Sequence, residues 1–133
     1  MSDSALLVSS KGITGEEFQD FALRLGGVPR GSGRYVVIEG DSNIWLALLR
    51  FDRVAEFYDE DTVSGWAEGL GEPPEIIVEI QLDHTDKSRE LYLKIAVEFG
   101  RAWPVVLVDL EGRDVSYALA CERYAVLRGN ACQ

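Results

Sequence analysis

The stretch from Asn43 to Phe51 is apolar on both faces, and it constrains the fold more than any other part of the sequence. If it forms a strand, its alternating positions give two apolar sets: Ile44, Leu46 and Leu48, and Trp45, Ala47 and Leu49. A strand of this kind is typical of the interior of a sheet whose two faces are both covered, at least in part. We therefore expect this segment to be a central strand.

The segments beside it predict further strands. Arg34–Glu39 is rich in β-branched residues, and Gly40-Asp41 suits a tight turn that would join it to the central strand as a hairpin. Glu75–Leu82 alternates, with Glu79 and Gln81 on one face, so one side of it should meet water. The remaining segments expected to be extended are Pro104–Val108, Val115–Tyr117 and, as a short lead-in, Ala5–Val8.

Three longer helices are expected. Thr14 and Glu17 form a capping box, and Gly26-Gly27 ends the helix that it begins. A second long helix should begin at Thr85 or Asp86 and close at Gly100. The last is expected over Leu119–Arg128, with Ala120, Tyr124 and Leu127 on one face.

Together these elements give the order α-β-β-(α)-β-α-β-β-α, in which hairpin strands alternate with helices. This pattern predicts an α+β fold: a mostly antiparallel sheet of about five strands, with two long helices packed on one face. A ferredoxin-like arrangement is one candidate topology. The sequence contains no repeat or linker, so residues 1–133 are expected to form one globular domain with an acidic insertion at 52–75.

Composition excludes several functional classes. The chain has 133 residues, 23 of them acidic and 13 basic, for a net charge of −10, and it is 47% hydrophobic. That apolar content is too high for a disordered chain, and the negative charge argues against nucleic acid as a partner. No apolar run approaches the length that spans a bilayer, and the first residues do not form a secretion signal. We expect a cytoplasmic protein without a membrane partner.

The residue types needed for catalysis are scarce. His84 is the only histidine, no serine or cysteine motif accompanies it, and Cys121 is expected to be a small buried side chain in a helix. One histidine and two distant cysteines give no metal-ligand set. Gly31-Ser32-Gly33 leads into a strand, so it predicts a flexible loop and no phosphate site. The aspartates near strand ends are explained by turn chemistry: Asp41, Asp83 and Asp109. We expect neither enzymatic activity nor a cofactor nor a metal.

One segment stands out by its charge. Residues 52–75 hold eight acids and a single base, Arg53, and therefore carry −7 of the net −10. Val63, Trp66, Ala67 and Leu70 recur at helical spacing and should fix a short helix to the body of the protein, although Gly65 and Gly69 weaken it. Acids interleaved with aromatic residues suit the surface that binds a basic protein. The predicted contact residues are Asp52, Glu56, Tyr58, Asp59, Glu60, Asp61 and Glu68. A solvated acidic connection is the equally weighted alternative.

Three stretches of the chain resemble small bacterial immunity proteins of the polymorphic-toxin and contact-dependent-inhibition type. They are the hairpin Val36–Leu46 with its early tryptophan, the acidic passage Asp59–Pro74, and Ser88–Val108, where a helix precedes Trp103-Pro104 and a valine-rich strand. The resemblance implies a protein without catalytic residues that binds and neutralises a cognate toxin domain, as a monomer or a homodimer. It assigns no contact residue.

Two alternatives remain open at this stage. Type III secretion chaperones resemble the chain in size, acidity and helix-strand order, and they are dimers that hold an effector in extended form. The polar face of the third strand and the acidic insertion depart from the exposed apolar grooves expected of such a chaperone. The other alternative, a small enzyme acting on a cationic substrate, lacks a nucleophile or a base constellation.

Overall fold

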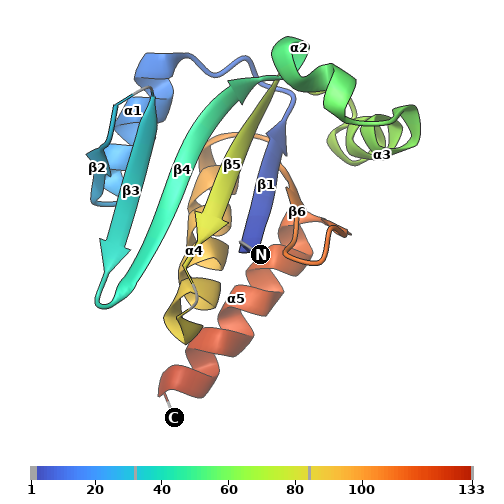
Figure 1. Cartoon of the computed structure of the whole chain (residues 1–133). Helices are drawn as coiled ribbons and strands as arrows, with labels where there is room; N and C mark the ends of the chain where they lie inside the picture. Colours follow the sequence, from blue (N-terminus) through green and yellow to red (C-terminus); the bar gives the residue numbers. More distant parts are fainter. Residues whose placement is uncertain (1–2, 32, 84, 133) are drawn as a thin grey trace.

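An antiparallel sheet of seven strands forms the framework of the computed structural model, which describes residues 3–31, 33–83 and 85–132 (Figure 1). The strands are β1 (Asp3–Ser9), β2 (Gly27–Pro29), β3 (Arg34–Glu39), β4 (Ser42–Arg50), β5 (Ile76–Leu82), β6 (Val106–Val108) and β7 (Asp114–Val115). The helical segments are α1 (Gly15–Arg24), α2 (Phe51–Val54), the 3-10 turn η1 (Ala55–Phe57), α3 (Glu60–Leu70), α4 (Asp86–Ala102) and α5 (Tyr117–Cys132). The expected α+β class is confirmed.

The predicted hairpin and central strand are confirmed. β3 and β4 are joined by Gly40-Asp41, where Gly40 has a φ of 61° and so occupies the left-handed region that a tight turn needs. β4 lies between β3 and β5. Ile44 and Leu46 are fully buried on one of its faces, whereas Trp45 on the other face is 41% exposed. β4 is therefore well covered on one side and less covered on the other.

The N-terminal segment was expected to be a short lead-in, but β1 is an interior strand of the sheet. It pairs with β5 along its whole length and with β6 on its other side. Its sequence is brief and lies at the chain start, so its local pattern carries no sign of two neighbours that come from distant parts of the chain. β2 was not expected at all, because glycine and proline are poor strand formers. These two strands raise the expected number of about five to seven in the described residues.

The spatial order is β2-β3-β4-β5-β1-β6-β7. Within it, the elements β1-α1-β4-β5-α4-β6 follow one another as strand, helix, two strands, helix and strand, and their strands lie in the order β4-β5-β1-β6. This is the connectivity of a ferredoxin-like core. β2 and β3 extend one edge of that core, β7 extends the other, and the α2–α3 segment is inserted between the core strands β4 and β5.

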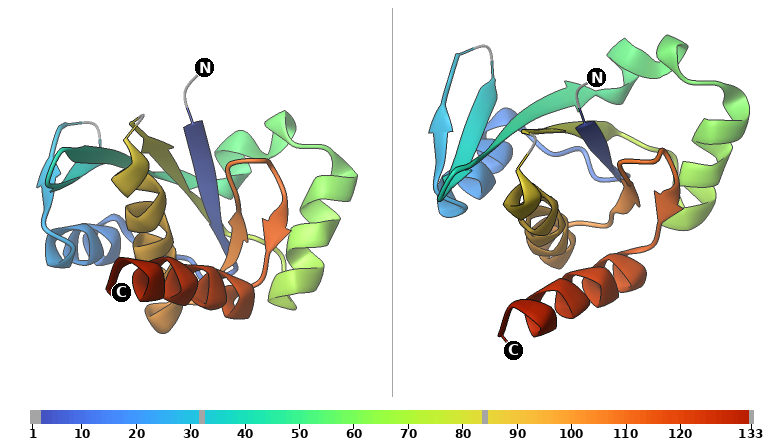
Figure 2. Two further views of the ribbon diagram at one scale, coloured as in Figure 1. Left: turned by 90° about the horizontal axis from the view of Figure 1, so that it is seen from below. Right: turned by 60° about the horizontal axis from the view of Figure 1, so that its bottom comes forward.

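Three helices, and not two, cover one face of the sheet. α1, α4 and α5 lie together on this side (Figure 2), where their apolar side chains share one core with the sheet. Phe21 of α1 and Phe99 of α4 pack edge to face, with ring centroids 5.5 Å apart. The last helix is longer than expected: α5 begins at Tyr117, which was assigned to a strand, and continues to Cys132.

α3 packs on the opposite face of the sheet, beside the β6 end (Figure 2). There it covers a second, smaller apolar cluster formed by Val8, Ile77 and Val106. The expected short helix between the second and third predicted strands is thus confirmed. Elsewhere on this face, Trp45 and Ile38 are partly exposed to solvent.

Gly100 does not close α4 as predicted, because the helix continues to Ala102. It is instead a contact position: a Cβ at Gly100 would overlap the ring of Tyr117, whose hydroxyl donates to the Val97 carbonyl oxygen at 3.0 Å. The absence of a side chain lets the first turn of α5 approach α4 closely. A glycine at a helix crossing was therefore misread as a helix stop.

Candidate functional site

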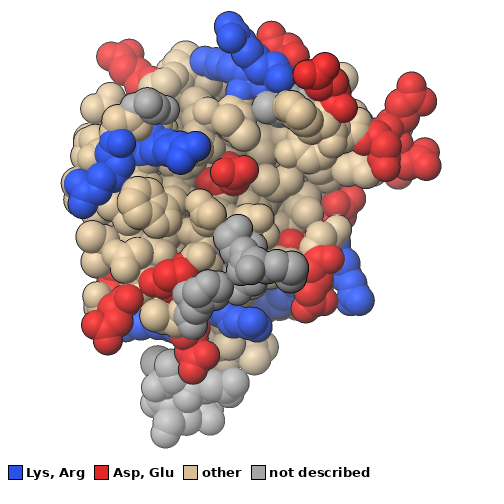
Figure 3. All heavy atoms as spheres, in the orientation of Figure 1, with Lys and Arg blue, Asp and Glu red and all other residues tan. Residues whose placement is uncertain are grey.

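The predicted contact residues lie on the α2–α3 insertion. Their acidic members are all exposed: Asp52, Glu56, Asp59, Glu60, Asp61 and Glu68. We call these six residues the acidic surface. Figure 3 shows acidic side chains gathered at the upper right, over α2 and α3, beside the mainly uncharged face of the sheet. The structure therefore brings the predicted acids together on one protruding segment.

Trp66 anchors this segment to the body of the protein. Its side chain is 1% exposed, and its indole Nε1–H donates to Asp114 Oδ1 at 3.2 Å. Val63 and Leu70 pack beside it against the cluster of Val8, Ile77 and Val106. Burying a side chain as large as tryptophan removes much apolar area from water, so it holds α3 in a defined position.

The two glycines of α3 serve this contact. A Cβ at Gly69 would lie 2.8 Å from Val106 Cγ2, and a Cβ at Gly65 would lie 3.1 Å from Asp114 Oδ2. Each glycine therefore lets the helix approach the β6–β7 edge more closely than a larger residue would. The two glycines lower the helix propensity of α3, and their presence is explained by this close packing.

Several acids also stabilise α3 itself. Asp59 is the N-cap, and its Oδ1 accepts from the Thr62 backbone N–H at 2.7 Å. Hydrogen bonding from Thr62 holds the pKa of Asp59 below its usual value. Glu60 and Asp61 occupy the first turn, where negative charge interacts favourably with the helix dipole. These three acids thus have a structural role in addition to any role in binding.

The acidic surface is not neutralised by the protein's own basic side chains. Among the residues that the structure describes, five ion pairs form, and none includes an acid from 52–75. Phe57 lies within the same segment and is 73% exposed. A large exposed aromatic ring among uncompensated acids is a combination found at protein-binding surfaces.

Tyr58 differs in position from the other predicted contact residues. Its ring packs against Trp66 with centroids 4.9 Å apart, and it is half-buried. Burial, together with the nearby Glu79 carboxylate, raises the pKa of Tyr58 above its usual value. Tyr58 thus packs inside the insertion, against Trp66, while its neighbour Phe57 is the aromatic residue that faces solvent. Adjacent aromatic residues in an irregular segment give no sequence signal for which one faces outward.

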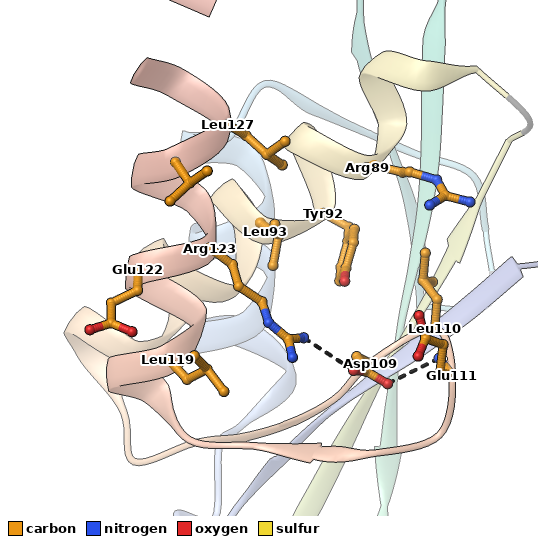
Figure 4. Close-up of a pocket in the computed structure, with 11 residues that line it drawn as sticks. Arg89, Tyr92, Leu93, Asp109, Leu110, Glu111, Leu119, Glu122, Arg123 and Leu127 are labelled. Carbon is orange, nitrogen blue, oxygen red and sulfur yellow. Dashed lines mark hydrogen bonds and ion pairs between the residues drawn. The ribbon is translucent and has the colours of Figure 1, made fainter. Parts of the chain in front are cut away.

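A second site was not foreseen from the sequence. A cleft of about 710 Å³ lies between α4, α5 and the β6–β7 turn (Figure 4). Its lining residues are Arg89, Tyr92, Leu93, Asp109, Leu110, Glu111, Leu119, Glu122, Arg123, Val126 and Leu127. They come from three separate segments, each with an ordinary local pattern. Only the packing of the two helices brings them together.

Asp109 organises the floor of this cleft. It is 5% exposed, its Oδ1 accepts from the backbone N–H groups of Glu111 and Arg113, and its Oδ2 accepts from the Arg123 guanidinium at 3.1 Å. Burial alone would raise the pKa of Asp109, but these donors outweigh it and hold the pKa below its usual value. Asp109 is therefore an ionised, fully bonded group that fixes the position of Arg123.

Tyr92 forms part of the cleft wall. Its side chain is 6% exposed, and burial raises the pKa of its hydroxyl, with a further contribution from the Asp109 carboxylate. The hydroxyl therefore stays protonated at neutral pH and can donate a hydrogen bond.

The other candidate side chains have structural explanations. Asp83 accepts from the backbone N–H groups of Asn43 and Thr85, so with Asp109 it performs the expected turn chemistry. Cys121 was expected to be buried but is only half-buried. Two further residues lie outside the described part of the chain: His84, and Ser32 in the glycine-rich loop.

The described residues offer neither a metal site nor a membrane-spanning helix. Across 3–31, 33–83 and 85–132, no three histidine, cysteine or acidic side chains converge in a way that could hold a metal ion. Within the same ranges, no helix combines the length and the apolar character required to cross a membrane. The candidate sites are therefore the acidic surface and the cleft.

No family model, curated protein or solved structure matches this chain. The resemblance to immunity proteins accordingly stays a prediction. The features of the molecule that bear on function are the acidic surface and the cleft.

Proposed function

We propose that this protein is a non-enzymatic inhibitor of the immunity type, which binds a basic toxin domain through its acidic surface. The observation that carries the proposal is the set of exposed acids without internal ion pairs, placed around the exposed ring of Phe57. A solvated connection between two strands needs neither the exposed ring nor the buried anchor at Trp66.

The acids and the aromatic ring would act at different stages of binding. Uncompensated negative charge attracts a basic partner over several ångströms and speeds encounter, most strongly at low salt. Phe57 then supplies apolar area at the centre of the contact, which slows dissociation. Because Trp66 holds α3 in place, little conformational entropy is lost when the partner docks.

The first experiment tests protection. A toxin-like domain encoded beside the gene for this chain is expressed in a bacterial host, with and without the chain. Survival only when both are present is the expected result. The proposal would be contradicted if the chain protected the host against none of the basic domains encoded beside the gene.

A kinetic experiment tests the surface. Reversing Glu56, Glu60 and Glu68 to lysine leaves the Asp59 cap intact, and we expect association with the toxin domain to slow at least about tenfold at low salt. Phe57→Ala should mainly accelerate dissociation. The matched control reverses three exposed acids outside the insertion: Glu16, Asp20 and Asp86. It makes the same change in net charge, so equal slowing in both triple variants would remove the acidic surface from the proposal.

The chaperone alternative is favoured by one observation, the open apolar area around Trp45 and Ile38, which are 41% and 50% exposed. A chaperone would use such a face to hold an extended effector segment. Light scattering discriminates between the two functions. A stable dimer that captures an extended peptide supports the chaperone, whereas a complex with a folded basic domain supports the inhibitor.

A further inference from the structure

The cleft between α4 and α5 has the dimensions of a small-molecule site. Its volume of about 710 Å³ falls inside the range of roughly 300–1,000 Å³ that is usual for ligand pockets. It also has the usual composition of such pockets, with mainly apolar walls and a few polar groups that converge from different elements. The cleft shares no residue with the acidic surface, so a ligand bound there is independent of the proposed function.

The apolar side of the cleft is formed largely by one face of α5. Leu119, Val126 and Leu127 recur at helical spacing, and they are 39%, 62% and 37% exposed. Leu93 of α4 continues this surface toward the core. Apolar side chains that are this exposed on a helix next to a concavity would be shielded from water by the body of an apolar ligand.

The polar side chains that line the cleft are three hydrogen-bond donors, Arg89, Tyr92 and Arg123, and three carboxylates, Asp109, Glu111 and Glu122. Asp109 engages one N–H of the Arg123 guanidinium, which has five such donors, and the Arg123 side chain is 41% exposed. The Tyr92 hydroxyl and the guanidinium of Arg89 lie on the α4 side (Figure 4). Three donor groups on two helices therefore border one concavity.

The acids of the cleft offer little competition for these donors. Both oxygens of Asp109 are already engaged by Arg123 and by backbone N–H groups. Glu111 pairs with Arg113 at 3.9 Å. Glu122 lines the cleft as well, and its side chain leaves the α5 ribbon on the opposite side to Arg123 (Figure 4). The cleft therefore matches a ligand that brings hydrogen-bond acceptors.

We propose that this cleft binds a small apolar molecule that ends in a carboxylate. The apolar body would lie along Leu119, Val126 and Leu127, and the carboxylate would contact Arg123 and the Tyr92 hydroxyl. A planar guanidinium held by a buried carboxylate is a preorganised partner for such an anion. Arg89, which also lines the cleft, adds a second positive charge.

The test is an NMR titration of the full chain with octanoate, followed by its backbone amide signals and the Arg123 Nε–H signal. For a ligand of this size we expect a dissociation constant on the order of 1 mM. The signals that shift should belong to α4, α5 and the β6–β7 turn. Octylamine and octanol, which share the apolar body, should bind at least about fivefold more weakly because they bring no carboxylate. Equal binding of all three probes, or no shifts in the cleft, would overturn the proposal.

Variants locate the ligand. Val126→Glu places an acid on an exposed position of the apolar wall, where it should weaken octanoate binding about tenfold without disturbing the core. Arg123→Lys keeps the charge beside Asp109 but loses the planar fork, so it should weaken binding about threefold or more. Arg30→Gln, an exposed arginine remote from the cleft, is the control and should leave binding unchanged. Wild-type affinity in both cleft variants would contradict the assignment.

Discussion

At the scale of single residues, Asp109 shows how one side chain can join a turn to a helix. Its carboxylate accepts from two backbone N–H groups of the β6–β7 turn and from Arg123 of α5. The sequence reasoning correctly assigned it turn chemistry, because an aspartate after a strand often bonds to the following backbone. Its ion pair with Arg123, 14 residues later, depends on the return of α5 to the sheet and left no local signal.

The lowered pKa of Asp109 gives a pH prediction with a definite sign. Its ionised form stabilises the fold above the unfolded-state pKa of about 3.9, and this contribution is lost as the pH falls through the lower folded-state pKa. We expect Asp109→Asn to reduce the unfolding free energy by about 1–3 kcal/mol at pH 7. Urea unfolding from pH 7 to pH 2 should show the difference from wild type shrinking below about pH 4. A constant difference over that range would contradict the prediction.

At the scale of elements, local patterns predicted those elements whose stability comes from local contacts. The capping box of α1 is confirmed, since the Thr14 and Glu17 side chains each accept a backbone N–H of the other residue. The β3–β4 hairpin is also confirmed, because its two strands are neighbours in sequence and are joined by a tight turn. β1 and β2 were missed because their positions come from pairing with strands distant in sequence. Gly100 of α4 was misread as a helix end, because a close helix approach and a helix end both favour glycine. Gly65 and Gly69 of α3 were expected to weaken their helix, and their packing role was missed.

The glycine in α4 provides the test at this scale. Gly→Ala inside a helix usually stabilises it, but at Gly100 the new Cβ would overlap the Tyr117 ring. We expect Gly100→Ala to reduce the unfolding free energy by about 1–3 kcal/mol in urea denaturation. The control is Gly129→Ala in α5, where the new Cβ would have no atom within 4 Å beyond its chain neighbours and the backbone of its own helix. It should be neutral or stabilise by up to about 1 kcal/mol, and equal effects at the two glycines would refute the packing explanation.

At the scale of the whole molecule, the sequence predicted the acidic surface but not the cleft. The acidic surface could be predicted because its residues are contiguous in the chain and its helix carries an apolar stripe. The cleft could not, because Tyr92, Asp109 and Arg123 belong to three segments and meet only through the packing of α5 on α4. Contiguous sites follow from composition, whereas composite sites require the tertiary arrangement.

The net charge of −10 predicts how the whole molecule responds to salt. Self-repulsion, concentrated in the insertion, opposes the folded state and is screened as ionic strength rises. We expect the unfolding free energy to increase by on the order of 0.5 kcal/mol between 10 mM and 150 mM NaCl. Each Glu→Lys change adds two positive charges, so reversing Glu56, Glu60 and Glu68 moves the net charge from −10 to −4 and should reduce this response. If the unfolding free energy of that variant rose with salt as much as that of the wild type, the repulsion would not lie in the insertion.

The way the insertion joins the sheet has an evolutionary consequence. Its two ends leave from Arg50 and Ile76, which face each other in the β4–β5 ladder, and the Phe51 backbone N–H donates to the Glu75 carbonyl oxygen at 3.0 Å. A segment with adjoining ends can be exchanged for another without altering the register of the sheet. The replacement needs only a large apolar side chain that, like Trp66, covers the cluster of Val8, Ile77 and Val106. The sheet and its register can therefore stay constant while the inserted segment changes in sequence and length.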